Sequence, residues 1–280
     1  MKIGIIGNGY VGNATKLLVS KDNNLFIYDI NPKLCSPENL TLDGLKNCDI
    51  IFLCLPTPMN PDGSCHLDIV KNTVDKLKKI VNSECCLILR STVPPNTSNE
   101  LNINFMPEFL TEKNSKNDFI NSKEWIFGLN DSQDTLSKNK IISLINNAYK
   151  NDLIKSNHIV WKTNSEAEMI KYFRNSFLAV KVSYCNEFYR LCEKMKISYK
   201  NVISTAASDS RINESHTNVP GHDGRFGFGG TCFPKDSNSL LSIFKENNID
   251  SPILSSTIYR NENIDRSEKD WTDNIGRAVI

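Results

Sequence analysis

Short apolar runs alternate with longer amphipathic stretches along the chain up to residue 162. Short runs of Ile, Leu, Val and Phe are typical of strands buried on both faces of a sheet. They predict strands at residues 2–6, 25–28, 50–55, 85–89, 103–106, 125–129 and 158–162. Apolar residues at helical spacing predict helices around 11–18, at 67–81 and at 132–149. This alternation predicts a doubly wound α/β sheet of the Rossmann type.

The pattern changes near Trp161. Residues 165–195 contain neither Gly nor Pro and predict one long helix, with apolar positions at Ala167, Ile170, Phe173, Phe177, Val180 and Tyr184. A stripe of Lys and Asn on a long helix is typical of a solvent-facing surface, and this one carries Lys171, Asn175 and Asn186. Further helices are expected at 202–207, 237–245 and 253–259, followed by a polar, frayed tail from residue 261. We therefore expect a Rossmann-type domain at 1–162 and a smaller all-helical domain at 163–280.

The first strand runs into a G-x-G-x-x-G formed by Gly7, Gly9 and Gly12, and the second strand ends at Asp29. In dinucleotide-binding folds the first Gly makes the turn, the second admits the pyrophosphate and the third packs helix on strand. Asp29 lies twenty positions after Gly9, where a carboxylate accepts hydrogen bonds from the ribose hydroxyls and favours NAD over NADP. The pattern predicts an NAD site; the alternative is a structural glycine turn.

Candidate site residues follow the later strands. Thr57 and Thr92 fall at strand ends, where ligands bind in open α/β sheets, although Ser, Thr and Pro are also frequent in ordinary turns. Glu108 and Glu112 would share a face if their segment is helical, and paired acids can serve acid/base catalysis. The ordinary alternative is a pair of solvated carboxylates.

The stretch from Gly224 to Asp236 holds four glycines within seven residues, then Cys232 and a Pro-Lys-Asp triplet. Such glycine density suits a backbone that turns tightly or lets a ligand approach. Lys235 is close in sequence to Cys232, and a nearby cation favours the reactive thiolate. The alternative is a mobile loop with a buried cysteine and Asp236 as the N-cap of a helix that begins at Ser237.

Composition excludes several classes of function. The formal net charge of the 280-residue chain is +1, which gives no general attraction to nucleic acid or to an anionic membrane. No apolar run approaches the ~20 residues that span a bilayer, and the N-terminus lacks the pattern of a signal peptide. The nine cysteines include no CxxC pair and no zinc spacing, which favours reduced thiols in the cytoplasm and no metal site.

Taken in order, these pieces resemble the UDP-glucose/GDP-mannose dehydrogenase family, the nucleotide-sugar 6-dehydrogenases. The resemblance covers residues 1 to about 260. It rests on residues 7–12, Leu55-Pro56-Thr57-Pro58, Ser91-Thr92-Val93-Pro94-Pro95, Met106-Pro107-Glu108-Phe109-Leu110, residues 168–175, Lys181 with Asn186-Glu187, Asp209-Ser210-Arg211-Ile212 and residues 227–236.

The resemblance implies oxidation of a sugar C6 alcohol to a carboxylate with two NAD per turnover, UDP-glucose to UDP-glucuronate being the leading candidate. It implies a Cys232 nucleophile that forms a thiohemiacetal and then a thioester. The other implied catalytic residues are Lys171, Asn175, Asp236, Glu108, Glu112 and Thr92. The implied cofactor residues are Gly7, Gly9, Tyr10, Val11, Gly12, Asp29, Pro56, Thr57, Thr92 and Lys235. The implied substrate residues are Glu108, Phe109, Leu110, Lys171, Asn175, Arg211, Phe226 and Gly229.

One departure from the family is large, because its members continue through a third α/β domain that grips the nucleotide. We expect a homodimer formed through the long helix, and a partner chain is a candidate source of the missing nucleotide contacts. Two alternatives stay open: a two-electron dehydrogenase of the 3-hydroxyacid type, and a non-catalytic NAD-binding remnant.

Overall fold

The structure is a computed structural model that describes residues 1–111 and 114–280. The chain forms two compact units. The first contains residues 1–57 and 67–171, and the second contains residues 58–66 and 172–280. The division into functional domains at residue 162 stays a prediction.

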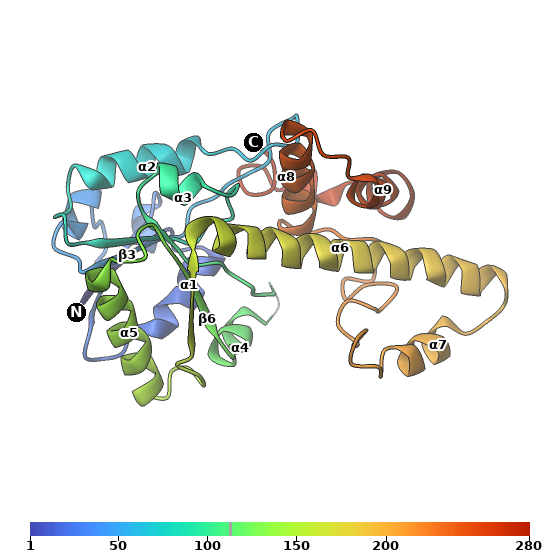
Figure 1. Cartoon of the computed structure of the whole chain (residues 1–280), viewed down its shortest axis with the longest axis horizontal. Helices are drawn as coiled ribbons and strands as arrows, with labels where there is room; N and C mark the ends of the chain where they lie inside the picture. Colours follow the sequence, from blue (N-terminus) through green and yellow to red (C-terminus); the bar gives the residue numbers. More distant parts are fainter. Residues whose placement is uncertain (112–113) are drawn as a thin grey trace. The chain divides into compact units, whose positions relative to one another are not determined.

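The first unit is built on a seven-stranded sheet (Figure 1) with the order β2-β1-β3-β4-β5-β6-β7. All neighbours pair in parallel except β5 and β6. The strands are β1 (Lys2–Ile6), β2 (Asn24–Tyr28), β3 (Ile50–Leu53), β4 (Cys86–Leu89), β5 (Asn104–Phe105), β6 (Trp125–Leu129) and β7 (Ile159–Thr163). The expected Rossmann-type sheet is therefore confirmed.

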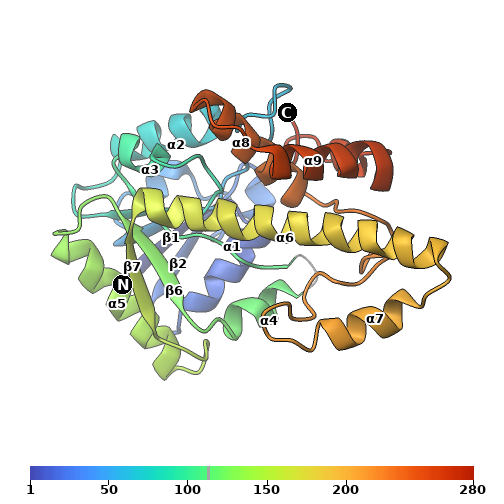
Figure 2. The same cartoon turned by 45° about the vertical axis from the view of Figure 1, so that its right-hand side comes forward.

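Apolar side chains cover both faces of this sheet. One face carries α1 (Tyr10–Thr15), α4 (Ser115–Ile120) and α5 (Thr135–Lys150), packed against strand residues such as Ile5 and Phe52. The other carries α2 (Asp68–Lys78), packed against residues such as Leu53 and Leu89, with the short α3 (Thr97–Glu100) on the same side (Figure 2). Burial on both faces explains why the strands contain continuous apolar runs.

The strand order reverses between β1 and β3, which are neighbours in the sheet with Ile6 opposite Leu53. In open α/β sheets the ligand crevice lies at such a switch point, outside the carboxyl ends of the strands. The G-x-G-x-x-G that starts at Gly7 follows β1, and the segment that ends at Thr57 follows β3. The topology therefore positions the predicted cofactor residues.

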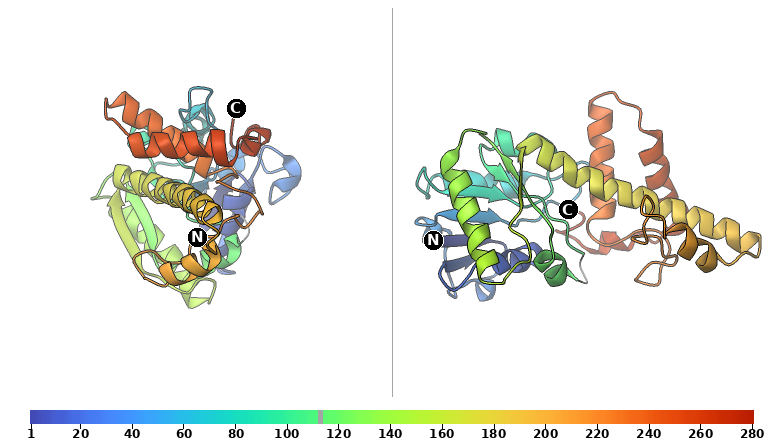
Figure 3. Two further views of the ribbon diagram at one scale, coloured as in Figure 1. Left: turned by 90° about the vertical axis from the view of Figure 1, so that its right-hand side faces the viewer. Right: turned by 60° about the horizontal axis from the view of Figure 1, so that its bottom comes forward.

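The second unit consists mainly of helices. The long helix α6 (Asn164–Lys194) begins in the first unit and continues into the second. It is followed by α7 (Tyr199–Ala206), α8 (Phe233–Glu246) and α9 (Pro252–Arg260), and α8 and α9 lie side by side (Figure 3). One core cluster joins α6, α8 and α9 through Tyr172, Leu240, Leu254 and Ile258. Another joins α6 to α7 through Cys185, Cys192 and Tyr199. No helix among the described residues has the length and apolar character that a membrane crossing requires.

Part of α6 differs from what the sequence predicted, although Ala167, at the start of the expected apolar face, is buried. Lys171, Asn175 and Asn186 are buried, with exposed fractions of 3%, 6% and 2%. By contrast, the side chains of Phe173 and Phe177 are 66% and 59% exposed. The expectation of a solvent-facing polar stripe was wrong because each of these polar side chains has partners that replace water.

Two expectations near the C-terminus were also wrong. Helix α8 begins at Phe233 rather than Ser237, so Cys232 is its N-cap residue and Asp236 lies inside its first turn. A Pro at position 234 suits the first turn of a helix, where no backbone N–H is required. The tail after residue 260 is folded rather than frayed, since Trp271 is buried and the Met59 N–H donates to the Ala278 carbonyl over 2.9 Å.

Candidate active site

The glycine turn after β1 has the packing that a dinucleotide site requires. Gly7 has φ +88, and a Cβ there would lie 2.3 Å from the Cys54 carbonyl oxygen. A Cβ at Gly12 would lie 1.9 Å from the Gly7 oxygen, so this glycine is needed for close packing. A Cβ at Gly9 would meet nothing within 4 Å. The backbone at Gly9 therefore borders open space, which fits the approach of a pyrophosphate.

Asp29 closes the same site from the end of β2. Its Oδ2 accepts from the Asn8 N–H over 2.7 Å, and its Oδ1 accepts from the Asn31 N–H over 2.9 Å. These bonds fix the carboxylate beside the turn while each oxygen keeps a further lone pair to accept a ribose hydroxyl. Asp29 also lines a cavity of about 340 Å³ together with Tyr28, Ile30, Cys35 and other residues up to Leu42. Among the described residues, these features fit the adenosine part of NAD.

The ends of β3 and β4 are linked by side chains. Thr57 is buried, and its hydroxyl donates to the Thr92 carbonyl over 2.8 Å. The Ser91 hydroxyl donates to the Leu55 carbonyl over 2.6 Å and accepts from the Leu55 N–H over 3.0 Å. Thr57 therefore has a structural role, and its contact with cofactor stays a prediction.

Glu108 and Lys171 form a buried ion pair within the first unit. Lys171 Nζ lies 3.1 Å from Glu108 Oε2 and also donates to the Glu108 carbonyl. The Leu110 N–H donates to Glu108 Oε1, and the ammonium lies 5.5 Å from the centre of the Phe109 ring. Residues 106–111 are not helical, so the described part of this segment contradicts a shared helical face, and Glu112 lies outside the described residues.

Glu168 is a buried acid to which sequence analysis gave no role. Its Oε2 accepts from the Asn96 N–H over 2.7 Å and its Oε1 from the Ser98 N–H over 2.8 Å. Burial raises the pKa of Glu168 to about 7, although these hydrogen bonds act in the opposite direction. The acid thereby ties α6, one turn before Lys171, to the segment that follows Thr92 and Pro95. Its only sequence signal was its place in a segment shared with the resembled family.

The second unit gathers polar groups at the start of α8. Cys232 is the N-cap residue, and its carbonyl accepts from the Asp236 N–H over 2.8 Å. Lys235 Nζ lies 2.5 Å from Asp236 Oδ1, and Asn175 Nδ2 donates to Asp236 Oδ2 over 2.5 Å. All three of these side chains are buried. The structure therefore brings together four of the predicted residues, Cys232, Lys235, Asp236 and Asn175.

A buried lysine lies near Cys232 at this helix start. Burial opposes the charge of Lys235, but the nearby Asp236, Cys65 and Cys232 outweigh it and raise the pKa of Lys235 above its ordinary value. A thiolate at Cys232 would therefore lie near an ammonium that stays charged and at the positive end of α8. Cys65, on the loop of residues 58–66 that belongs to this unit, was missed because nothing in the sequence links it to α8.

The predicted substrate residues of the second unit differ in their surroundings. Arg211 is exposed, and its guanidinium is held by Asp209 with Nη2 and Oδ2 2.5 Å apart. The Phe226 ring lies 5.1 Å from the Arg190 guanidinium. A Cβ at Gly229 would lie 2.5 Å from the Arg266 guanidinium carbon. Their contact with substrate stays a prediction.

The mostly parallel sheet, its glycine turn and the acid after β2 define a dinucleotide-binding protein of the Rossmann class. Residues 37–151 match the NAD binding domain of the UDP-glucose/GDP-mannose dehydrogenase family, and residues 165–263 match its central domain. The chain is 32% identical over 305 residues to a UDP-glucose 6-dehydrogenase of Rickettsia bellii, covering 94% of this chain and 67% of that protein. The chain belongs to the UDP-glucose/GDP-mannose dehydrogenase family, and its cofactor is NAD.

Solved structures show the same fold. A UDP-glucose dehydrogenase from Pyrobaculum islandicum matches with a TM-score of 0.77 and 22% identity, over 93% of this chain and 68% of that one. A 3-hydroxyisobutyrate dehydrogenase from Mycobacterium tuberculosis matches with a TM-score of 0.69 and 17% identity, over 92% of this chain and 91% of that one. The fold is therefore shared by dehydrogenases named for different substrates and does not by itself identify the substrate.

Proposed function

We propose that the protein oxidises the C6 alcohol of a nucleotide sugar to a carboxylate in two steps, with UDP-glucose as the leading substrate. The observation that supports this most is Cys232 at the N-cap of α8, beside the buried Lys235–Asp236 pair. A simple alcohol oxidation does not require a thiol. A thiol is needed where an aldehyde must be held covalently and oxidised again.

When bound, NAD supplies the hydride acceptor for both oxidations. The Cys232 thiolate attacks the aldehyde carbon and forms a thiohemiacetal, whose oxidation leaves a thioester. Water then adds to the thioester carbonyl, and the C–S bond breaks to release the carboxylate and the thiol. A thiolate adds readily to an aldehyde, and its adduct can lose a hydride to give a thioester that water hydrolyses.

Lys171 and Asn175, one helical turn apart on α6, are proposed to stabilise negative charge that develops on the reacting oxygen. The Asn175 amide gives one N–H to Asp236, which fixes its orientation and leaves the second N–H for this task. Glu108 is proposed as the base for hydrolysis from the resemblance, and Lys171 holds its buried carboxylate in place. The support of this step by Thr92 and Glu112 rests on the resemblance alone.

Binding roles are proposed for the remaining residues. The turn from Gly7 to Gly12, including Tyr10 and Val11, would hold the pyrophosphate, while Asp29 would bind the ribose. Pro56, Thr57, Thr92 and Lys235 are proposed to contact cofactor. Phe109, Leu110, Arg211, Phe226 and Gly229 are proposed to contact substrate. A partner chain that completes the nucleotide site stays a prediction.

A two-electron dehydrogenase of the 3-hydroxyacid type is the rival function, since a 3-hydroxyisobutyrate dehydrogenase shares the fold over 91% of its length. The deciding experiment counts NADH formed per sugar consumed with a panel of nucleotide sugars: UDP-glucose, UDP-N-acetylhexosamines and GDP-mannose. Two NADH per sugar would support the proposal, and one would favour the rival. Bound NAD without any turnover would favour a non-catalytic protein or one that needs a partner chain.

We also propose a homodimer formed through α6. Exposed apolar side chains lie three, four or seven residues apart along the helix and directly after it, at Phe173, Phe177, Tyr184, Phe188, Leu191 and Met195. The Phe173 and Phe177 rings stack 6.0 Å apart, which makes a continuous apolar surface. Such spacing suits packing against an identical helix of a second copy.

A further inference from the structure

The loop of residues 227–230 leads directly into Cys232, and its backbone is held by two buried asparagine side chains. Asn261 Oδ1 accepts from the Phe228 N–H over 2.7 Å, and Asn261 Nδ2 donates to the Phe228 carbonyl over 2.9 Å. Asn186 Oδ1 accepts from the Gly227 N–H over 3.1 Å. Asn261 and Asn186 are 1% and 2% exposed. The paired contacts on Phe228 satisfy both of its backbone groups, as a neighbouring strand would.

Two glycines of the loop are needed because of the side chains beneath them. A Cβ at Gly227 would lie 2.4 Å from Asn261 Oδ1, and φ at this residue is +66. A Cβ at Gly229 would lie 2.5 Å from Arg266 Cζ. Four glycines within seven residues were an unexplained feature of the sequence. For these two, the cause is close packing on Asn261 and Arg266.

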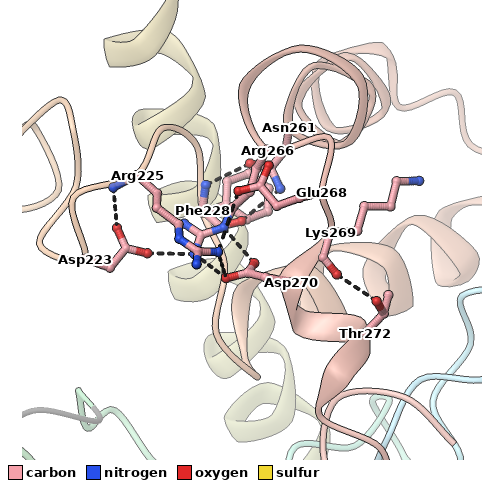
Figure 4. A network of polar contacts seen from close by, with 9 residues as sticks. All are labelled: Asp223, Arg225, Phe228, Asn261, Arg266, Glu268, Lys269, Asp270 and Thr272. Atoms are coloured by element: carbon pink, nitrogen blue, oxygen red, sulfur yellow. Dashed lines mark hydrogen bonds and ion pairs between the residues drawn. The ribbon is translucent and has the colours of Figure 1, made fainter.

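Arg266 cannot easily move away from the loop. Its Nη2 lies 2.7 Å from Asp223 Oδ2 and 2.6 Å from Asp270 Oδ2, and its Nε donates to Asp270 Oδ1 over 2.7 Å (Figure 4). The side chain is 4% exposed. Two carboxylates thus fix the guanidinium in the position that the Gly229 backbone packs against.

Asn261 and Arg266 are the two ends of one π-helical turn after α9, in which the Arg266 N–H donates to the Asn261 carbonyl over 2.8 Å. Such turns are rare and frequently found at functional sites. Here the extra residue in the turn places both side chains on the glycine loop.

We propose that Asn261 and Arg266 are positioning residues for Cys232. They fix the backbone of residues 227–230 and thereby hold the thiol at the N-cap of α8, near Lys235. Neither residue is proposed to touch the substrate. The expected effect on turnover rests on the proposed function, whereas the effect on the thiol does not.

The test compares Asn261→Ala, which removes both contacts with Phe228, and Asn261→Asp, which keeps the acceptor for the Phe228 N–H but replaces the donor with a buried carboxylate oxygen. The matched control is Asn263→Ala, an exposed residue of the same turn whose amide donates to the Tyr259 carbonyl. Leu254→Ala is the control for stability alone, since it removes buried apolar volume from α9 in the same unit. The readouts are kcat, the KM for NAD, and the alkylation rate of Cys232 by iodoacetamide followed by peptide mass spectrometry.

We expect Asn261→Ala to lower kcat about 100-fold while the KM for NAD stays within about twofold of that of the unmodified protein. We expect alkylation of Cys232 to slow about tenfold because less thiolate is present, with a smaller effect for Asn261→Asp. Both controls should leave the alkylation rate unchanged. If Leu254→Ala slows alkylation as much as Asn261→Ala, or if neither Asn261 variant differs from Asn263→Ala, the positioning role is wrong. Absence of turnover in the unmodified protein would count against the proposed function, while the alkylation rates would still decide the role of Asn261.

Discussion

Lys235 and Asp236 are consecutive residues, and in the first turn of α8 they form a buried ion pair with Nζ and Oδ1 2.5 Å apart. Their side chains are 9% and 1% exposed. The other carboxylate oxygen, Oδ2, accepts from the Asn175 amide of α6. The pair therefore links the start of the helix that carries Cys232 to the long helix beside it.

Replacing Asp236 should show how strongly folding depends on the buried Lys235–Asp236 ion pair. Asp236→Asn leaves the Lys235 ammonium buried without its carboxylate, which should lower the free energy of unfolding by about 3–5 kcal/mol. Adding Lys235→Met removes the buried charge and should restore more than half of that loss. Urea unfolding of the two variants and of Asp250→Asn, an exposed acid, measures both effects. If Asp236→Asn were as stable as Asp250→Asn, the ion pair would not be what stabilises this helix start.

Asp29 should matter for cofactor affinity. Asp29→Ala removes the ribose acceptor and should raise the Kd for NAD about 10- to 100-fold, as measured by calorimetry. The matched control is Asp49→Ala, because Asp49 also accepts from a backbone N–H, that of Lys2 in β1, but lies at the opposite end of the strands. Unchanged affinity in Asp29→Ala would remove this residue from the site. An equal loss in both variants would mean that the effect is on the sheet rather than on the ribose.

Cys232→Ser should stop the reaction before the second oxidation, because a hydroxyl is far less nucleophilic than a thiolate near neutral pH. The yield should fall from two NADH per sugar to at most one, with an aldehyde that a hydrazine can trap. Cys65→Ser is the control, since that thiol also lies near Lys235 but is not proposed to react. Full uronate production by Cys232→Ser would refute the thioester mechanism.

Glu168 should make stability depend on pH near neutrality. Its pKa of about 7 in the folded protein lies above the ordinary 4.5, so the folded state holds the proton more tightly than the unfolded state does. The stability that this proton contributes is fully present below pH 4.5 and is lost as the pH rises towards about 7. Glu168→Gln does not titrate, so its unfolding midpoint in urea should fall less than that of the unmodified protein between pH 5 and about 8.

The control for that comparison is Glu166→Gln. Hydrogen bonds from Thr163 lower the pKa of Glu166. Glu166→Gln should therefore not reduce the pH dependence of stability between pH 5 and about 8. The negative charge of Glu100 raises the pKa of Glu168 further. Equal pH dependence in the unmodified protein and in Glu168→Gln would contradict the shifted pKa.

Much of the fold followed from local patterns in the sequence. The strands from Lys2 to Ile6 and from Trp125 to Leu129 have the predicted bounds, because their apolar runs are buried on both faces. The start of α8 was misplaced by four residues. Asp236 was expected to cap the helix from outside. Pro234 indicates an earlier start, because proline fits the first turn of a helix and disrupts its interior.

Other features could not be predicted because they depend on distant partners. Burial of Lys171 requires Glu108, sixty-three residues away, and burial of Asn186 requires the backbone of Gly227. A helical wheel of α6 alone therefore favours the wrong face. The same limit applies to the loop with Cys65, whose position near Lys235 depends on long-range packing.

The apolar face that α6 exposes gives the last prediction. If a second copy covers it, Phe177→Glu should place a charge in the centre of the interface and shift the protein from dimer to monomer in sedimentation velocity experiments. Ile253→Glu is the matched control, because Ile253 is 71% exposed on α9 and lies outside the row from Phe173 to Met195. The dimer should persist in that control. A monomeric unmodified protein, or a Phe177→Glu variant that sediments as a dimer, would show that α6 is not the interface, and the aromatic rings would then require another explanation.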